Sequence, residues 1–356
     1  MKNPVNVKSK ILIIRFRRVG DAVISSVLCS SLKKSFPNAE IHYILNENIA
    51  PLFENHPDID KIITFSDEDQ KSFFQYISKV WKIVSDNQYD IIVDTRSTIK
   101  TLWFSLFSLR TPSRIGRKKA YNQFIQNHRV ALGHEDEVSN TLKLLKPLYH
   151  KYKIEMIRHF NLYTTLEEKQ AFRRKMEATG LDLSRPIIVC AVTARLEHKV
   201  WAKEKMVEIL RRMLDKFPDI QLIFNYAGER EKSNSFDIFH ALNQNPRIFI
   251  NLEAHNLREL LALYSFSSFF FGNEGGPRHI SQAMNVPGLA IFPPSIPKSV
   301  WLPNSCERFQ GIELADINPL AAKEEALSFE EKFQQIDTES VWNQLEPMLE
   351  KFADNR

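Results

Sequence analysis

Residues 267–295 read SSFFFGNEGGPRHISQAMNVPGLAIFPPS, a stretch with the pattern of a complete strand–helix–strand unit. The apolar run at 267–272 predicts a buried strand, and the run at 288–292 predicts the next one. Between them, Pro277 suits the first turn of a helix, because an N–H group in that turn has no intrahelical partner to lose. A strand, a helix and a second strand in succession are typical of a parallel sheet covered by helices.

The same alternation of apolar runs and amphipathic segments is found in both halves of the chain. The other strands are predicted at 11–16, 41–45, 61–65, 90–95, 186–192, 220–226 and 247–252. A charged helical region at about 137–182 separates the two series. We therefore predict an α/β protein with two Rossmann-like domains, residues 1–160 and 161–337, followed by a C-terminal helical segment, 338–356.

The composition is that of a globular protein. Of the 356 residues, 43% are hydrophobic and 26% are charged, which argues against a disordered chain, a collagen-like repeat or a coiled coil. No apolar run reaches the ~18 residues needed to span a bilayer, and the first residues do not resemble a secretory signal, so a cytoplasmic protein is expected. Cys29, Cys190 and Cys306 are too far apart for a disulfide framework or a metal site.

The basic residues are unevenly distributed. Lys and Arg outnumber Asp and Glu by 48 to 43, and a net charge of +5 is too small to indicate a nucleic-acid partner. Between Asp94 and Glu135 there is no carboxylate, and the basic residues there are Arg96, Lys100, Arg110, Arg114, Arg117, Lys118, Lys119 and Arg129. An anionic partner is therefore expected at this surface. Within it, the aromatic segment 97–110 fits either a packed helix or a surface for a lipid-bearing anionic acceptor.

Glycine is scarce, which gives the sequence GNEGG particular weight. The chain has 10 glycines where an average usage of about 7% would give about 25, and three of them fall in this pentapeptide. A helix start lined by glycine offers N–H groups and a positive dipole end to a phosphate, and Gly275 and Gly276 would let it approach the backbone. Arg278 and His279 add donors, and Glu274 could accept hydrogen bonds from sugar hydroxyls. The alternative is a tight turn without a ligand.

Two other strand ends carry candidate catalytic and binding residues. The segment RFRRVGDAVISSVL lacks the spacing GxGxxG, which argues against a nicotinamide enzyme. Its Asp21 lies in the predicted first turn of a helix, where the dipole favours the ionised form, so it is either a general base or only a charge at a helix start. In the segment AVTARLEHKVWAKEKM, Thr193, Arg195 and Lys199 could hold a diphosphate, with Lys199 stabilising the leaving group. The alternative there is a solvated loop.

Three motifs occur in an informative order. They are ILIIRFRRVGD (11–21), KVW (199–201) after a loop that contains threonine, and GNEGGPRHISQAMNVP (272–287). Over about residues 10–295 this combination resembles glycosyltransferase family 9, the bacterial lipopolysaccharide heptosyltransferases. The resemblance implies the GT-B fold, in which two Rossmann-like domains with parallel sheets face each other across a cleft and the last helix packs back on the first domain. It also implies metal-independent, inverting transfer of a sugar, typically heptose from ADP-heptose, to the inner core on lipid A.

The resemblance also implies roles for individual residues. Asp21 matches the carboxylate proposed as catalytic base, and Lys199 matches the lysine that contacts the donor. The other residues expected on the side of the nucleotide-sugar donor are Thr193, Arg195, Glu274, Gly275, Gly276, Arg278 and His279. The residues expected on the side of the anionic acceptor are Arg18, Arg96, Lys100, Arg114, Arg117 and Lys118.

Some positions depart from the family pattern and bear on the substrate. Glu274 stands where many members have Asp, the loop that ends at Lys199 is longer, Val27 replaces a frequent Pro, and Pro293 replaces a usual Gly. The alternatives are therefore the same fold with a UDP- or GDP-linked donor for a different glycan, or a non-catalytic nucleotide-binding member. No cofactor, metal or nucleic acid is expected. The expected partners are the nucleotide-sugar, an anionic glycolipid and, peripherally, the inner face of the cytoplasmic membrane.

Overall fold

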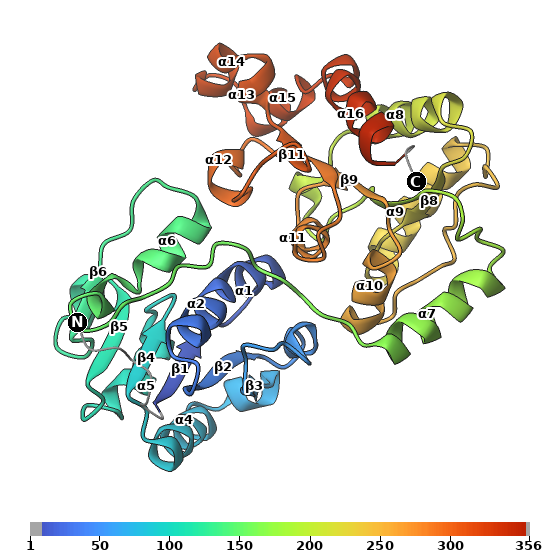
Figure 1. Ribbon diagram of the computed structural model, residues 1–356. Helices are drawn as coiled ribbons and strands as arrows, with labels where there is room; N and C mark the ends of the chain where they lie inside the picture. Colours follow the sequence, from blue (N-terminus) through green and yellow to red (C-terminus); the bar gives the residue numbers. More distant parts are fainter. Residues whose placement is uncertain (1–8, 354–356) are drawn as a thin grey trace. The chain divides into compact units, whose positions relative to one another are not determined.

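The computed structural model describes residues 9–353, and the chain folds into two compact units divided between Tyr163 and Thr164. Each unit contains one parallel β-sheet together with several helices (Figure 1). The division lies three residues after the end of the first predicted domain, residue 160. It falls in the irregular segment that precedes the helix beginning at Leu166.

The sheet of the first unit has six strands in the order β3-β2-β1-β4-β5-β6. The strands are β1 (Lys10–Ile14), β2 (Glu40–Asn46), β3 (Lys61–Phe65), β4 (Ile91–Asp94), β5 (Ser113–Arg117) and β6 (His128–Val130). The helices are α1 (Val19–Ser25), α2 (Val27–Ser35), α3 (Asp67–Lys71), α4 (Phe73–Asn87), α5 (Ile99–Leu106) and α6 (Glu137–Lys143), with 3-10 turns η1 (Ala50–Phe53), η2 (Ala120–Asn122) and η3 (Lys146–Leu148). All four strands predicted in this unit are present. The sequence pattern missed β5 and β6, because both are short and rich in basic residues.

The sheet of the second unit has five strands in the order β11-β10-β9-β7-β8. The strands are β7 (Ile187–Ala191), β8 (Gln221–Phe224), β9 (Phe269–Asn273), β10 (Gly288–Ile291) and β11 (Phe309–Ile312). The helices are α7 (Leu166–Ala178), α8 (Lys203–Lys216), α9 (Gly228–Ala241), α10 (Leu257–Tyr264), α11 (Gly276–Ala283), α12 (Lys298–Trp301), α13 (Leu314–Ile317), α14 (Pro319–Lys323), α15 (Phe329–Gln334) and α16 (Thr338–Phe352), with the 3-10 turn η4 (Glu197–Lys199).

One predicted strand of the second unit is not formed. The run at 247–252 makes only an isolated bridge, from Ile248 to Leu222. Its start is part of a turn, because the Asn245 carbonyl accepts from the N–H of Ile248 at 3.0 Å and the Asn245 side chain accepts from the N–H of Arg247. The pattern also missed β11, which pairs with β10 at the edge of the sheet.

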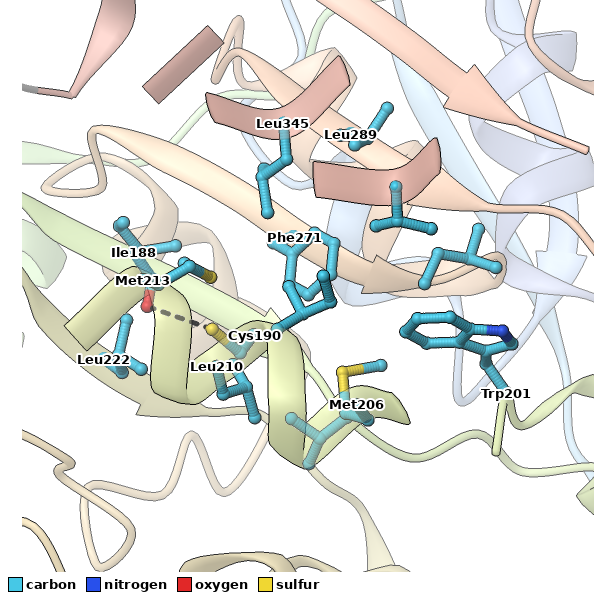
Figure 2. Close-up of a cluster of buried hydrophobic side chains, with 14 of the residues drawn as sticks. Ile188, Cys190, Trp201, Met206, Leu210, Met213, Leu222, Phe271, Leu289 and Leu345 are labelled. Atoms are coloured by element: carbon cyan, nitrogen blue, oxygen red, sulfur yellow. Dashed lines mark hydrogen bonds between the residues drawn. The ribbon is translucent and has the colours of Figure 1, made fainter. Parts of the chain in front are cut away.

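The core of the second unit lies between the sheet and the helices α8 and α16 (Figure 2). β7 and β9 are buried along their whole length, as expected for central strands of a parallel sheet with both faces covered. They approach each other closely at Gly272, where φ is 141° and an added Cβ would lie 2.3 Å from the carbonyl oxygen of Ala191. Glycine at this position is therefore a requirement of the fold itself.

The C-terminal helix α16 packs within the second unit. Its buried residues Val341, Leu345, Met348 and Leu349 belong to the core of this unit, and the helix lies against α8. This differs from the expectation that 338–356 packs on the first domain. The physical reason is that α8 and the neighbouring core cover the apolar face of the helix.

Two searches of the described residues bear on function. None of the helices within residues 9–353 is long and apolar enough to cross a membrane. In the same range, no group of three or more His, Cys, Asp and Glu side chains is arranged to hold a metal ion. Cys29 and Cys190 are buried free thiols, and Cys306 is an exposed one.

Candidate functional site

The strand order marks one place in each sheet where a ligand would bind. In the first sheet β4 lies on the opposite side of β1 from β2, and in the second sheet β9 lies on the opposite side of β7 from β8. Open parallel sheets bind ligands outside the carboxyl ends of the strands at such switch points. The segments after β1, β4, β7 and β9 carry Asp21, Arg96, Lys199 and Glu274. The fold therefore places predicted site residues at the switch point of each unit.

In the first unit, Asp21 is buried in the first turn of α1 and pairs with Arg15. Its Oδ1 lies 2.5 Å from Nη2 of Arg15, and the two side chains are 9% and 5% exposed. Arg15 directly follows β1, and its Nη1 donates to Oγ1 of Thr95, after β4, at 3.4 Å. Within the described residues, Nε of Arg15 has no hydrogen-bond partner. Arg15 therefore fixes the direction of the Asp21 carboxylate, a contact that the sequence alone did not indicate.

The loops around Asp21 have an unusual backbone conformation. Arg17, Arg18 and Ser97 have φ angles of 64°, 49° and 51°, values that residues with a side chain rarely adopt. Hydrogen bonds hold both loops: the N–H of Arg17 donates to Oδ1 of Asn46 at 2.6 Å, and that of Ser97 donates to Oδ1 of Asp94 at 2.8 Å. Strained residues that are held in this way cluster at binding and catalytic sites.

Positive charge is concentrated at this edge of the sheet. Burial lowers the pKa of Arg96. The nearby charges of Arg15, Arg17 and Arg117 lower this pKa further, whereas the carboxylate of Asp21 raises it. Since guanidinium groups match the geometry of phosphates and carboxylates, the edge suits an anionic ligand.

Three further residues expected on the acceptor side also lie near this edge. Arg18 is the N-cap residue of α1 and Lys118 directly follows β5, and both are exposed. Lys100 is partly buried in the first turn of α5, and its Nζ donates to Oε1 of Gln70 at 2.9 Å. Burial and the positive charge of Arg17 lower the pKa of Lys100.

The two arginines of β5 have different surroundings. Nη2 of Arg117, at the end of the strand, lies 2.7 Å from Oε1 of Glu137. Arg114 is 9% exposed. Its guanidinium donates to the backbone carbonyls of Ile125, Leu109 and Thr111 at 2.9, 2.8 and 2.6 Å. The structure thus gives Arg114 a role in holding loops together, which corrects the expectation that it contacts the acceptor.

In the second unit, the partly buried Lys199 and the buried Glu274 and His279 form one cluster. Nζ of Lys199 lies 2.8 Å from Oε2 of Glu274, and Nε2 of His279 lies 3.5 Å from Oε1 of the same carboxylate. Burial would raise the pKa of Glu274, but the hydrogen bond with His279 and the charges of His279, Arg278 and Lys199 lower it to about 2. The Glu274 carboxylate is therefore ionised, and the positively charged side chains around it lie at the start of α11.

Arg278 lies against this cluster, because its Nη2 is 2.8 Å from Nδ1 and 2.7 Å from Nε2 of His279. Its Nη1 donates to Oε1 of Gln282 at 2.7 Å, and its Nη2 donates to the carbonyl of Trp301 at 2.6 Å. The side chain is 3% exposed, and burial lowers its pKa to about 10. Arg278 therefore joins α11 to α12 and also contacts His279 of the cluster.

The loop after β7 is tied to the start of α9. Oγ1 of Thr193 donates to Oε2 of Glu231 at 3.3 Å, and Thr193 is buried. Arg195 is exposed, and its carbonyl accepts from the guanidinium of Arg230. Thr193 and Arg195 thus lie beside the first turn of α9, while Lys199, at the end of the same loop, reaches Glu274.

Trp201 and Asn273 connect this loop to the sheet. The Trp201 N–H donates to Oδ1 of Asn273 at 2.8 Å, and Nδ2 of Asn273 donates to the carbonyl of Ala191 at 3.0 Å. Trp201 is 1% exposed, and its indole N–H donates to the carbonyl of Ile336. These contacts fix the position of Lys199 relative to Glu274. Asn273, which the sequence reasoning did not single out, is the residue that links the two loops.

The start of α11 has room for a ligand. Gly275 is the N-cap residue, with an extended backbone at φ 172°, and an added Cβ would meet nothing closer than Cδ of Pro277 at 3.7 Å. Gly276 is the first residue of the helix. The packing of the chain itself therefore does not require glycine at position 275, in contrast to position 272. N–H groups of a first helical turn have no intrahelical partner, so a phosphate could bind here.

Comparisons with known proteins agree in the family they indicate. The family model described as glycosyltransferase family 9 (heptosyltransferase) matches residues 77–324. Lipopolysaccharide heptosyltransferase 1 of Campylobacter coli is 24% identical over 295 residues, which cover 80% of this chain and 83% of that protein.

Two solved structures share the fold along almost the whole chain. The crystal structure of the glycosyl transferase family 9 from Veillonella parvula DSM 2008 has a TM-score of 0.80 at 16% identity, over 96% of this chain and 97% of that chain. The ADP-heptose lps heptosyltransferase II of E. coli has a TM-score of 0.72 at 18% identity, over 96% and 99%. Together with the two parallel-sheet units, these likenesses confirm the predicted GT-B fold class.

Proposed function

Because the chain belongs to glycosyltransferase family 9, we propose that it transfers heptose from ADP-heptose, with inversion, to an inner-core acceptor of lipopolysaccharide. The chain is a glycosyltransferase of the heptosyltransferase family. The identities of the donor and of the acceptor are what we propose. The E. coli relative of the same fold is named as an ADP-heptose heptosyltransferase, which supports this donor.

The observation that carries the proposal is the cluster of Lys199, Glu274 and His279 at the start of α11. Here a partly buried ammonium group lies next to a helix start with a glycine that packing does not require. A nucleotide diphosphate matches both features, since its oxygens accept from Lys199 and from first-turn N–H groups. Thr193 and the exposed Arg195, at the neighbouring loop, are proposed to assist, and the Glu274 carboxylate to accept from a sugar hydroxyl.

The proposed reaction is a single displacement at the anomeric carbon. Oδ2 of Asp21 takes the proton of the acceptor hydroxyl, while Arg15 holds Oδ1. The acceptor oxygen forms a bond to the anomeric carbon as the bond from that carbon to the diphosphate breaks. ADP leaves with the electron pair, and Lys199 and the start of α11 stabilise its charge. These groups supply the positive charge that the leaving diphosphate needs, so the proposal assigns no step to a metal.

The acceptor is proposed to bind through its negative charges. Arg96 lies within electrostatic reach of Asp21 and of Arg117, and Arg18, Lys100 and Lys118 lie on the segments around them. Phosphates or acidic sugars of an inner-core glycolipid would neutralise this charge while one hydroxyl is presented to Asp21. The second candidate is a UDP- or GDP-linked donor, and it rests on one departure from the family pattern, the longer Glu274 side chain at the position proposed to meet the donor sugar.

Calorimetry with ADP, UDP, GDP and CDP, without added metal, tests the donor. Selective binding of ADP is the expected result. Preference for another nucleotide would keep the mechanism and replace the donor. If none of the four nucleotides binds, the assignment of the α11 start to a nucleotide diphosphate is wrong.

A further inference from the structure

The helices α4 and α5 of the first unit are neighbours (Figure 1). A group of apolar side chains lies on these two helices and on Phe107, directly after α5. We call it the aromatic patch, and it consists of the exposed Phe73, Phe74, Trp81 and Ile99 and the partly buried Trp103 and Phe107. Phe74 is 83% exposed, Ile99 71%, Phe73 58% and Trp81 56%. Neither the donor site nor the acceptor site proposed above uses these side chains.

The aromatic patch is continuous. Ring centroids are 6.0 Å apart for Phe74 and Phe73, and 5.7 Å apart for Phe73 and Trp103. The series continues from Trp103 to Phe107 at 5.5 Å and from Phe107 to Trp81 at 5.3 Å. Contiguous exposed apolar surface marks an interaction site, whereas single exposed side chains need no explanation.

The charges on the two helices of the aromatic patch are mostly positive, whereas the carboxylates of Asp67, Glu68 and Asp69 lie on α3, just before α4. No carboxylate occurs in residues 70–85, which include most of α4, or in residues 95–134, which include α5. Lys82, Lys100 and Arg110 each directly follow an exposed apolar side chain of these segments. Long basic side chains can keep their charge at the level of lipid headgroups while apolar neighbours are buried. Aromatic side chains flanked by cations complement an anionic bilayer surface better than they complement a neutral one.

The aromatic patch begins at the same edge of the sheet as the proposed acceptor site. α4 and α5 come after β3 and β4 along the chain, so both helices start near the carboxyl ends of parallel strands. The hydroxyl of Tyr76 in α4 donates to the carbonyl of Lys100 in α5 at 2.7 Å, which joins the two helix starts. Ile99 follows Arg96 by only three residues. A surface seated on this patch would therefore lie next to the Asp21 edge.

We propose that the aromatic patch docks on an anionic phospholipid bilayer, with Phe74, Trp81 and Ile99 buried at the boundary between headgroups and acyl chains. This inference rests on the proposed function, because a lipid-linked acceptor presents its sugar hydroxyl close to the membrane surface. Docking there brings the carboxylate of Asp21 to the depth at which that hydroxyl lies.

Vesicle flotation of the full chain tests the proposal. Vesicles of phosphatidylcholine with phosphatidylglycerol are compared with vesicles of phosphatidylcholine alone. Wild type should bind the anionic vesicles, and salt should weaken this binding. The double variant Phe74→Ser, Trp81→Ser should lower the partition coefficient at least about tenfold, since two exposed side chains lose their burial in lipid. The matched control is Leu320→Ser, which removes a side chain that is 83% exposed in the second unit and should change nothing.

A second readout keeps the test independent of the folding of the double variant. With brominated lipids, tryptophan fluorescence of wild type should be quenched on binding, and Trp81→Phe should lose part of this quenching. Failure of wild type to bind anionic vesicles, or equal binding by the double variant, would overturn the proposal. Self-association that the double variant abolishes, without vesicle binding, would overturn it too, because the patch would then be an interface between copies of this chain.

Experiments with a delipidated, soluble acceptor distinguish a failure of this proposal from a failure of the proposed function. The double variant should transfer sugar to that soluble acceptor at the wild-type rate. If wild type transfers no heptose but patch-dependent vesicle binding is observed, the proposed substrate is wrong and the docking surface stands. If transfer occurs without vesicle binding, the docking surface alone is wrong.

Discussion

At the scale of single residues, Glu274 organises the charges of the second unit. Its buried carboxylate lies against the ammonium group of Lys199 and the ring of His279. The side chain of Lys199 is 15% exposed and that of Glu274 is 4% exposed, so Lys199 is the partner that solvent or a ligand can reach. In the proposed reaction, the ammonium group of Lys199 interacts with both the Glu274 carboxylate and the diphosphate.

Replacing Glu274 with Gln should destabilise the protein in a pH-dependent way. The pKa of Glu274 is about 2, below its ordinary value of 4.5, so its ionised form contributes stability that is complete above 4.5 and is lost as the pH falls through 2. At neutral pH, Glu274→Gln should lower the free energy of unfolding by about 3 kcal/mol. Urea unfolding of both proteins measures this difference, which should shrink below pH 4.5.

The control for this prediction is Glu307→Gln. Glu307 is an exposed carboxylate paired with Lys351, so its loss should leave the stability unchanged at every pH. A difference between wild type and Glu274→Gln that is the same at neutral and at acid pH would show that the ion pairs of Glu274 do not stabilise the fold.

Replacing Lys199 with Ala should weaken the binding of ADP. A hydrogen bond between a charged group and a phosphate is worth about 1.5–3 kcal/mol, so the Kd for ADP should rise at least about tenfold. Lys203→Ala is the matched control, because Lys203 is an exposed lysine just beyond the same loop whose partner is Asp237. Calorimetry that gives equal affinities for wild type and Lys199→Ala would remove Lys199 from the donor site.

For individual candidate site residues, the place in the fold could be predicted from the sequence. The positions of Asp21, Lys199 and Glu274 could be predicted because each residue follows a buried strand, and such positions gather at one edge of a parallel sheet. The direction of a side chain was not predictable. Arg15 is one of three arginines at 15–18, and only the folded strand and helix show that it pairs with Asp21. Arg114 was misassigned for the same reason, since backbone carbonyls take up its guanidinium.

At the scale of elements, two glycines at the junction of β9 and α11 should respond differently to substitution. Gly272→Ala should lower the free energy of unfolding by about 2–4 kcal/mol, because its Cβ would meet the carbonyl oxygen of Ala191 at 2.3 Å and its φ is 141°. Gly275→Ala should leave the stability unchanged, because its Cβ meets nothing within 3.4 Å. It should nevertheless weaken ADP binding about tenfold, since the diphosphate is proposed to approach this backbone.

Thermal unfolding and calorimetry of the two glycine variants check this contrast. Each variant is the control for the other, since both add one methyl group a few residues apart. If Gly275→Ala binds ADP as tightly as wild type, the start of α11 does not hold the diphosphate.

The elements themselves were predictable where hydrophobic periodicity decides them. The buried central strands carry continuous apolar runs and were found, as was a helix within 97–110. The strand β5 and the edge strands β6 and β11 were missed because their short sequences hold few apolar residues. The run at 247–252 is apolar, but the turn at Asn245 outweighs its strand propensity. The packing of α16 depends on which surface its apolar face meets, which a single sequence does not define.

At the scale of the whole molecule, the two units divide the proposed chemistry. The first unit holds the proposed base, Asp21, and the positive edge for the acceptor, while the second holds the cluster for the nucleotide diphosphate. The two Rossmann-like domains were predictable because two βαβ series need only a repeated apolar pattern, and the GT-B fold class followed from the resemblance to the family. The donor sugar was not predictable, because a few side chains of a binding site decide it and no repeated apolar pattern records their preference.

The most direct test is transfer of heptose from ADP-heptose to a lipid A-linked inner-core acceptor, followed by mass spectrometry of the acceptor. Wild type should add a heptosyl residue. Asp21→Asn should lower kcat by at least about 100-fold with unchanged affinity for ADP, because it removes the proton acceptor and leaves the second unit intact. Asp67→Asn, which changes an exposed carboxylate in the first turn of α3, should transfer normally. Transfer by Asp21→Asn at nearly the wild-type rate, or no transfer by wild type, would contradict the account.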